Sequence, residues 1–319
     1  MTVIQPNSFD TTEMRMRVLV TGARGKVGSA AITALLHANH DVVGTDLVGP
    51  DYDKLAVGQE VPYVQAELRE PGDAFTVVRG CDAVVHCAAV PTHRNNTPHF
   101  VFANNLLATF NVAEAAASFG VERLVNISSA GVAGYIHGEQ EFLPDYLPTD
   151  EKERTRPQDP YAIAKHFGEQ LMDSLIRRSA VRCISLRPSW VQYPHNYAKN
   201  LGPGIRSPEP RLSRWSYVDI DDLTDAIVLS VNSTLPGHEV FHIAAADNTT
   251  GRPLETLVST FFAERIMVRP LVRPDASAVS SEKARQLLGY VPKRSWRDHL
   301  GEDGEPFTTE HTRERRYGL

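Results

Sequence analysis

Short apolar runs alternate with longer stretches of helical periodicity along most of this chain. The first run, Arg17–Val20, is rich in β-branched residues, and the apolar side chains of Val27–Leu35 then recur on one side, as in a helix. Later apolar runs, each of a length suited to a buried parallel strand, lie at Asp41–Asp46, Val61–Leu68, Cys81–Ala89 and Val121–Ser129. Residues 102–120 and 161–177 show helical spacing. Because strands and helices alternate, the pattern predicts a parallel sheet with right-handed crossovers.

The turn between the first strand and the first helix carries three regularly spaced glycines. Gly22, Gly25 and Gly28 repeat every third residue. The first glycine permits a tight turn, the second lets the backbone approach a pyrophosphate, and the third lets helix and strand pack closely. Phosphates at this position meet free N–H groups at the positive end of a helix. We therefore expect dinucleotide binding by the loop that also includes Ala23, Arg24, Lys26 and Val27.

These features predict an α/β fold of Rossmann type, a doubly wound parallel sheet with a smaller C-terminal substrate-binding lobe. At 319 residues, one such domain with a smaller lobe fits better than two independent domains. We expect residues 1–14 to be a flexible extension. Residues 15–186 and 217–243 should form the nucleotide-binding lobe, and residues 187–216 and 244–319 the substrate-binding lobe. The active site is expected at the carboxyl ends of the strands, between the lobes.

The acid that ends the second strand bears on which dinucleotide is bound. Asp46 lies about 24 residues after Gly22, where a carboxylate accepts hydrogen bonds from the adenosine ribose. A carboxylate at this point repels the 2′-phosphate of NADP, which favours NAD. Arg24 is the competing signal, because a cation in the glycine turn could hold that phosphate. The alternative for Asp46 is a solvated turn residue.

Composition narrows the class of protein further. A net charge of −6 offers no basic field for nucleic acid. The three cysteines are odd in number and apolar in context, which favours reduced thiols in the cytoplasm. The first thirteen residues are polar and lack the apolar core of a signal peptide. Since no apolar run approaches the roughly 20 residues of a membrane helix, a soluble protein is expected.

Candidate catalytic residues follow in a particular order along the chain. Ser129 ends the fifth predicted strand, and a long polar segment, Gly134–Pro160, leads to Tyr161 and Lys165. Tyr161 and Lys165 are four residues apart on a predicted helix, so they share a face. Such a pair alone is commonly a surface pair, and Ser129 alone could be a capping hydroxyl. The order of glycine turn, acid, serine and Tyr-x-x-x-Lys is much more specific.

Taken together, these motifs resemble the extended short-chain dehydrogenase/reductases, the NAD-dependent epimerase/dehydratase family. The resemblance runs from Arg17 to about Leu300. It implies that Ser129, Tyr161 and Lys165 are catalytic, with Asn105 from the helix before them. Tyr161 would take a proton from a substrate hydroxyl while hydride passes to NAD, and Lys165 would lower the phenol pKa and hold the nicotinamide ribose. Other cofactor contacts implied are Glu67, Leu68, Cys87, Ala88, Ala89, Ser128 and Pro188.

This chain departs from the family pattern where a substrate is recognised. The segment from Arg187 resembles the family's Arg-Pro-x-Asn-Val-Tyr-Gly-Pro, but Trp190 replaces the asparagine that lies beside a sugar nucleotide. An indole cannot repeat the hydrogen bonds of an amide, unless the segment is rearranged and Trp190 is simply packed in the core. Ala133 stands where the family often has tyrosine. Candidate substrate contacts are Pro91, His93, Arg94, Ser129, Ala130, Tyr161, Arg187, Trp190 and Arg214, with the arginines suited to a carboxylate or phosphate.

Three functions remain open at this stage. The first is an NAD-dependent epimerase or dehydratase that acts on a sugar nucleotide. The second is an NAD-dependent dehydrogenase of a free sugar, a sugar acid or another small alcohol. The third is an inactive NAD-sensing protein, which the presence of Ser129, Tyr161 and Lys165 disfavours. The helices at 102–120 and 161–177 resemble those that pair across the family's dimer, so a homodimer is the hypothesis. The histidines show no metal-ligand spacing, and no metal is expected.

Overall fold

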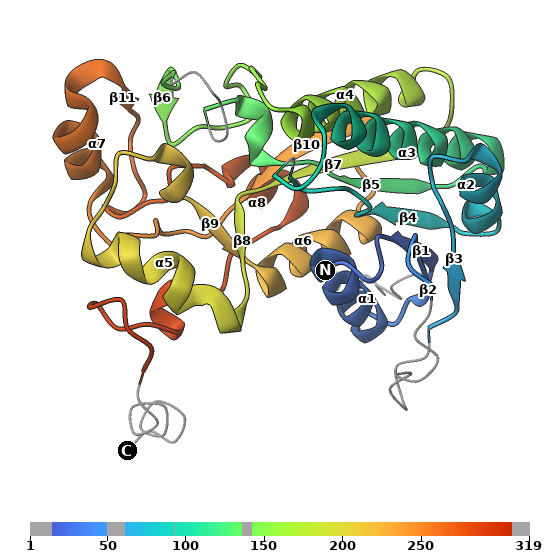
Figure 1. The fold of residues 1–319 in the computed structure, drawn as a ribbon, viewed down its shortest axis with the longest axis horizontal. Helices are drawn as coiled ribbons and strands as arrows, with labels where there is room; N and C mark the ends of the chain where they lie inside the picture. The colour runs from blue at the N-terminus through green and yellow to red at the C-terminus, as the bar shows by residue number, and fades with distance from the viewer. Residues whose placement is uncertain (1–14, 50–60, 93, 136–141, 308–319) are drawn as a thin grey trace, which may run out of the picture.

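The computed structural model describes residues 15–49, 61–92, 94–135 and 142–307 of the 319-residue chain. Seven parallel strands form the central sheet, in the order β10-β7-β5-β4-β1-β2-β3 (Figure 1). The strands are β1 (Arg17–Thr21), β2 (Asp41–Asp46), β3 (Tyr63–Gln65), β4 (Ala83–His86), β5 (Arg123–Ile127), β7 (Arg182–Pro188) and β10 (His238–Ile243). The order reverses between β1 and β4, so a crevice for a ligand lies at the carboxyl ends of these two strands. The predicted doubly wound sheet is confirmed.

Helices cover both faces of this sheet, as the continuous apolar strands require. One face packs on α2 (Pro71–Val78), α3 (Pro98–Phe119) and α4 (Pro160–Ile176), and the other on α1 (Lys26–His37), α6 (Ile220–Asn232) and α8 (Glu282–Leu288). Successive strand residues alternate between the two layers: Val84 joins the first and Val85 the second. In Figure 1, α3 and α4 lie together above the sheet, and α1 and α6 lie below it.

Several element boundaries differ from those expected, most of all those of α3 and β3. Helix α3 begins at Pro98, before Phe102, because the Thr97 hydroxyl accepts a hydrogen bond from the Phe100 N–H at 3.3 Å and caps the helix. The third strand shrinks to Tyr63–Gln65 because it lies at the sheet edge, where it has a single neighbour.

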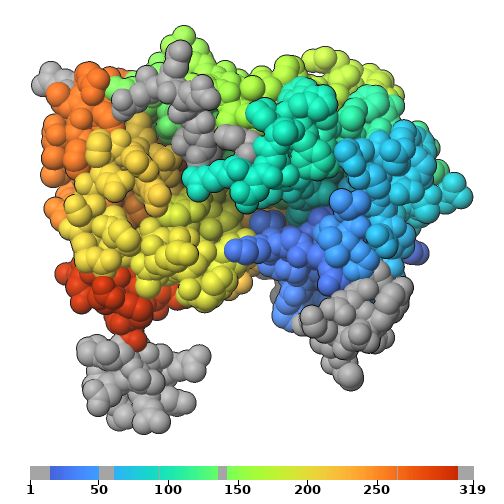
Figure 2. Space-filling model, viewed as in Figure 1, coloured from blue at the N-terminus to red at the C-terminus, as the bar shows by residue number. Residues whose placement is uncertain are grey.

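The remaining elements lie beyond the β10 edge of the sheet. They comprise α5 (Tyr197–Arg206), α7 (Leu254–Phe262) and two short pairs of parallel strands, β8 (Trp190–Gln192) with β9 (Tyr217–Asp219), and β6 (Tyr146–Leu147) with β11 (Met267–Val268). Strand β9 thus pairs outside the large sheet, although residues 217–243 were grouped with it on sequence grounds. In Figure 2 the segments that carry α5 (yellow) and α7 (orange) pack directly against the part of the chain drawn in green. The boundary between two lobes stays a prediction.

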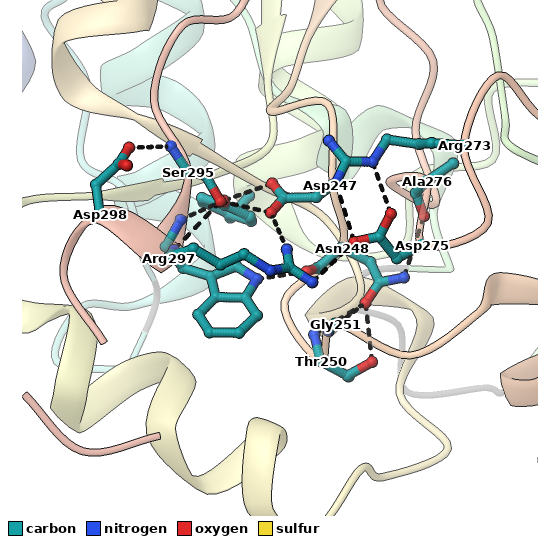
Figure 3. Close-up of polar contacts among 12 residues, drawn as sticks. Asp247, Asn248, Thr250, Gly251, Arg273, Asp275, Ala276, Ser295, Arg297 and Asp298 are labelled. Carbon is teal, nitrogen blue, oxygen red and sulfur yellow. Dashed lines mark hydrogen bonds and ion pairs between the residues drawn. The ribbon is translucent and has the colours of Figure 1, made fainter. Parts of the chain in front are cut away.

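A buried polar network fastens the C-terminal segment to the loop after β10 (Figure 3). Asp247, which is 1% exposed, accepts hydrogen bonds from Tyr217 at 2.7 Å and from Ser295 at 2.6 Å, and it pairs with Arg297 at 2.6 Å. The neighbouring Asn248 side chain accepts from the N–H groups of Thr250 and Gly251. Such a fully paired network holds its members in one geometry, so the loop at 247–251 is fixed in place beside the site described next.

Candidate active site

The glycine turn has the geometry that a pyrophosphate site requires. Gly22 has a φ of +66°, and a Cβ at this position would lie 2.8 Å from the Ala88 backbone at the end of β4. A Cβ on Gly28 would lie 2.1 Å from the Gly22 carbonyl oxygen. Both positions therefore exclude any side chain. Helix α1 follows with Gly25 as its N-cap and no side-chain capping bond, which leaves N–H groups of its first turn available to an anion.

Asp46 lies beside this turn at the end of β2. Its carboxylate accepts a hydrogen bond from the Arg24 N–H at 3.0 Å, while the Arg24 guanidinium donates to the Gly49 carbonyl at 2.9 Å. One carboxylate edge is thereby tied to the turn, and the residue remains partly exposed. The uncapped helix, the glycine-only positions and this carboxylate together fit the pyrophosphate and adenosine ribose of NAD. Ala23, Lys26 and Val27 complete the same loop, and Gly44 through Asp46 run alongside it.

The other expected cofactor residues divide into two groups. Cys87, Ala88 and Ala89 follow β4 and are partly buried at the carboxyl edge of the sheet, next to the glycine turn. Burial raises the pKa of the Cys87 thiol to about 12, which makes it unreactive. Glu67 and Leu68 lie after β3, where the Glu67 carboxylate already pairs with Arg69 at 2.7 Å and Leu68 is buried. An adenine contact by the Glu67 carboxylate would have to compete with that ion pair.

Ser129, Tyr161 and Lys165 meet at the ends of β5 and α4. Asp159 caps α4 by accepting from the N–H groups of Tyr161 and Ala162, both at 3.0 Å, so the helix begins with Tyr161 in its first turn. The Ser129 hydroxyl accepts a hydrogen bond from the Gly131 N–H at 3.0 Å, and its interaction with the Tyr161 side chain lowers the pKa of that phenol, against the larger effect of burial. Ser129 is thus both a cap of the following 3₁₀ turn and a partner of Tyr161.

The Lys165 ammonium is bound by the backbone of β5. It donates to the Ile127 carbonyl at 2.6 Å and lies 5.8 Å from the centre of the Tyr161 ring. Burial lowers the pKa of Lys165 to about 8, and burial raises the pKa of Tyr161 to about 12. The expected lowering of the phenol pKa by Lys165 is therefore not produced by the chain alone. Desolvation is the larger effect here, since Lys165 is buried and Tyr161 is partly buried.

A buried ion pair lies beneath these residues. Arg187, 5% exposed, binds Glu169 through two hydrogen bonds of 2.8 and 2.7 Å, and the Ser128 hydroxyl donates to the same carboxylate at 2.6 Å. Arg187 was expected to hold a substrate anion, and Ser128 to bind the cofactor. Instead, both side chains are engaged inside the protein, since a buried guanidinium needs a carboxylate partner. We correct the Arg187 assignment and do not include this residue among the proposed substrate contacts.

The Asn105 side chain is hydrogen-bonded to the backbone of the segment after β4. It is 2% exposed, and its amide accepts from the Val90 N–H at 2.7 Å and donates to the Val90 carbonyl at 3.0 Å. These bonds fix the segment that follows β4, which carries Pro91 and Arg94. In this arrangement Asn105 is a positioning residue, although the resemblance implied a catalytic one. His93 lies outside the described residues.

Most of the expected substrate residues surround one cavity of about 310 Å³. Ser129 opens into it from β5, Pro188 from the end of β7, and Arg94 from the segment after β4. The complete lining is Arg94, Ser129, Ala130, Gly131, Tyr135, Pro188, Ser189, Trp190, Leu212, Ser213, Arg214, Ser216 and Val279. It contains two arginines and no acidic residue. The exposed Pro91 is not among them.

Trp190 and Arg214 form one wall of this cavity. The Arg214 guanidinium lies 4.7 Å from the centre of the Trp190 ring, within the range of a cation–π contact. Trp190 is half-buried, so it is neither a free surface residue nor simply a core residue. Within the described ranges, neither Arg94 nor Arg214 has a carboxylate partner. The cavity thus presents positive charge next to Ser129.

Sequence reasoning missed three features of the site. Glu169, the partner of Arg187, follows Lys165 by one helical turn, and that spacing was the available signal. Serine hydroxyls form a buried chain that reaches the cavity lining, from Ser277 to Ser216 at 2.9 Å and on to Ser189 at 2.7 Å, the last two lining the cavity. Because these serines lie far apart in the sequence, no local pattern predicted that they would meet. The Lys26 ammonium also lies 5.1 Å from the centre of the Tyr193 ring, which links the glycine turn to the segment after β8.

Relatives of this chain include both isomerases and oxidoreductases. UDP-glucose 4-epimerase of Corynebacterium glutamicum is 24% identical over 326 residues, which cover 92% of this chain and 96% of that protein. Uronate dehydrogenase of Pseudomonas syringae pv. tomato is 25% identical over 236 residues, covering 73% of this chain and 76% of that enzyme. A protein of Methanocaldococcus jannaschii is 29% identical over 175 residues, and the match spans about half of each chain, 54% and 55%.

The solved structures agree on the fold. A short-chain dehydrogenase/reductase superfamily protein from Agrobacterium tumefaciens with bound NAD superposes with a TM-score of 0.68 at 22% identity, covering 95% of this chain and 98% of that one. No helix in the described part of the chain is long and apolar enough to span a membrane. The model of the NAD dependent epimerase/dehydratase family matches residues 18–244. This match takes in the glycine turn, Ser129, Tyr161 and Lys165, so the chain belongs to that family and is an NAD-dependent enzyme.

Proposed function

We propose that this protein is an NAD-dependent dehydrogenase that oxidises a hydroxyl group of a small anionic sugar, such as a sugar acid. The observation that carries the proposal is the cavity beside Ser129, which is lined by Arg94 and Arg214 and by no acidic residue. A guanidinium binds a carboxylate through two parallel hydrogen bonds. Two arginines without carboxylate partners among the described residues leave that capacity to a substrate.

The size of the cavity supports a single sugar unit. Its volume of about 310 Å³ is at the lower end of the roughly 300–1,000 Å³ of ligand sites. A free sugar acid fits this space more readily than a sugar joined to a nucleoside diphosphate. Serine hydroxyls on the lining, from Ser189, Ser213 and Ser216, can bond to the hydroxyl groups of such a substrate.

In this reaction the side chains of the protein remove the proton of the substrate hydroxyl. A bound NAD supplies the acceptor for the hydride. In the loaded enzyme, the positive charges of Lys165 and of the nicotinamide would lower the pKa of Tyr161 from its raised value in the chain alone. The Tyr161 phenolate then takes the proton of the substrate hydroxyl, and Ser129 donates a hydrogen bond to the same substrate oxygen. Lys165 carries its positive charge near this pair and binds the nicotinamide ribose. Its pKa of about 8 keeps it largely charged at neutral pH.

A sugar nucleotide remains the second candidate substrate, for an epimerase or dehydratase reaction. A further cavity of about 250 Å³ adjoins the first, and its polar lining includes Asn200, Thr250 and Arg211, which can bond to ribose or phosphate. The lining also includes Glu209, whose carboxylate pairs with Arg211 at 3.4 Å. The relative from Corynebacterium glutamicum, a UDP-glucose 4-epimerase, also matches over nearly its whole length. Trp190 stands between the two cavities, and for this reason we rank the candidate second.

The nucleotide released when freshly purified protein is denatured separates these reactions. A dehydrogenase exchanges NAD at each turnover, so we expect little retained nucleotide and reversible binding of added NAD. Retention of NAD near one molecule per chain would instead support an epimerase or dehydratase, in which the hydride returns to the substrate. The three cysteines are free, which suits the reducing cytoplasm proposed for the enzyme.

We also propose a homodimer formed by α3 and α4. These helices pack side by side, and they expose Leu107 (47%) and Phe110 (42%) on α3 and Phe167 (47%) on α4. Large apolar side chains on one face are typical of a surface that a partner covers. Light scattering should give the mass of two chains, and the double change Leu107→Glu and Phe167→Glu should give one. A single-chain mass for the unchanged protein would overturn the dimer.

A further inference from the structure

Two cavities of this protein share a single wall. The catalytic cavity of about 310 Å³ reaches Ser129, and the outer cavity of about 250 Å³ reaches Asn200 and Thr250. The residues that line both are Trp190 and Arg214. The Arg214 guanidinium carbon lies over the Trp190 ring, 4.7 Å from its centre, so the two side chains form one continuous wall between the cavities.

The backbone on each side of this wall is fixed. Trp190 begins β8 and is paired in register with Tyr217 of β9, and its ring packs against the cluster that includes Tyr197. The Arg214 carbonyl accepts a hydrogen bond from the Thr249 hydroxyl. Thr249 belongs to the loop that the network of Figure 3 holds in place. The wall therefore has a defined position and depends on two side chains alone.

Chemistry on the two sides of the wall is different. The catalytic side offers serine hydroxyls and no acidic residue, and the outer side offers the Asn200 amide and the hydroxyls of Thr249 and Thr250. The outer side also holds Arg211, paired with the Glu209 carboxylate at 3.4 Å. The amide, hydroxyl and guanidinium groups can bond to the second sugar or phosphate of a larger molecule. A ligand that used both cavities would have to pass through the space that the indole occupies.

We propose that the stacked side chains of Trp190 and Arg214 are the specificity determinant of this enzyme, and that they restrict it to sugars without a substituent on the anomeric oxygen. The inference rests on the proposed function, and it adds the residue pair that excludes glycosyl phosphates and sugar nucleotides. Removing the indole joins the cavities and opens the outer one to the substituent. An asparagine at position 190, as in the family pattern, would leave the cavities joined and would also supply an amide to the substituent.

The test compares one sugar acid with and without a substituent. The substrates are glucuronic acid, glucuronic acid 1-phosphate and UDP-glucuronic acid, and the proteins are the unchanged enzyme, Trp190→Asn and Trp190→Phe. We expect the unchanged enzyme to prefer the free acid at least 100-fold in kcat/KM. The asparagine variant should lower that preference at least tenfold, and the phenylalanine variant, which keeps an aromatic face under Arg214, should lower it much less.

Calorimetric binding of UDP-glucuronic acid provides a readout that does not depend on turnover. The asparagine variant should bind at least tenfold more tightly than the unchanged protein, and thermal unfolding should show that both are folded. If the free acid is oxidised but the preference and the binding are the same in both proteins, the wall does not determine specificity and the proposed function stands. If the unchanged protein oxidises no free sugar acid, the proposed function fails. Tighter nucleotide binding by the asparagine variant would still support the wall.

Discussion

The Arg187 guanidinium and the Glu169 carboxylate form a two-point ion pair in the interior, with separations of 2.8 and 2.7 Å. The pair joins the last residues of β7 to the helix that carries Tyr161 and Lys165. Because Ser128 donates to the same carboxylate, the pair also ties the end of β5 to this helix. The buried Glu169 carboxylate thus links β5, β7 and α4, the three elements that bring the catalytic residues together.

Replacing Glu169 by glutamine should be strongly destabilising. The change leaves the Arg187 charge buried without a counter-ion, and breaking a buried pair in this way costs about 3–5 kcal/mol. We expect the free energy of unfolding to fall by about 3 kcal/mol, near the lower end of this range, because the glutamine amide retains one hydrogen bond. Urea unfolding measures this change. The exposed pair of Arg154 and Asp145 is the control, where Arg154→Gln should cost less than about 1 kcal/mol. Equal effects at both sites would contradict the account.

Lys165 should make the stability of the protein rise with pH. Its pKa is lowered from 10.5 to about 8 in the folded state, so between these values the unfolded chain holds more protons. The free energy of unfolding therefore increases from about pH 8 to pH 10.5, by up to about 3 kcal/mol. In Lys165→Met this contribution disappears. The measurement is urea unfolding of both proteins across that range, and parallel pH curves would show that Lys165 is not the source.

Asp46 should set the preference for NAD over NADP. Its carboxylate lies beside the glycine turn, bonded to the Arg24 N–H at 3.0 Å, where a 2′-phosphate would meet negative charge. Asp46→Ser removes that charge and leaves the Arg24 cation nearby. We expect the ratio of dissociation constants for NADP and NAD to fall at least tenfold, which is about 1.4 kcal/mol. Asp41→Asn, at the other end of β2, should leave the ratio unchanged. An unaltered ratio in Asp46→Ser would remove this residue from the cofactor site.

Gly28 should tolerate no side chain. An alanine Cβ there would lie 2.1 Å from the Gly22 carbonyl oxygen, so the turn and α1 would have to separate. We expect Gly28→Ala to lose NAD binding by at least 100-fold, together with a lower melting temperature. Gly72→Ala is the matched control, because nothing lies within 4 Å of its added methyl group and the residue is in helix α2. That change should leave binding intact and raise stability slightly. Normal NAD binding by Gly28→Ala would refute the role of the turn.

Much of the fold could be predicted from local pattern. Five of the seven strands of the parallel sheet correspond to the predicted apolar runs, β7 and β10 being the two that were not predicted, and Gly22 and Gly28 predicted a close turn that the structure confirms. The order of Ser129, Tyr161 and Lys165 predicted their assembly at one edge. Each of these signals lies within a few residues of sequence, or repeats with a fixed period.

The rest depends on contacts between distant segments. Arg187 was expected to face a substrate, but its partner Glu169 lies on another element, and no local pattern reveals that pairing. The raised pKa of Tyr161 has the same origin, because burial is set by the whole fold. The contact of Trp190 with Arg214 joins the first residue of β8 to a turn before β9 and could not be inferred from either segment alone.

The most direct test of the proposed function is the rate of NADH formation from NAD with a panel of free sugar acids, neutral sugars and sugar nucleotides. Tyr161→Phe serves as the inactive control, with a loss of about 100- to 10,000-fold and retained NAD binding. The account predicts that a free sugar acid gives the highest kcat/KM and that the neutral sugar of the same configuration gives much less. NADH formation from no sugar acid, together with interconversion of sugar nucleotides without net NADH, would contradict it and would establish the epimerase reaction instead.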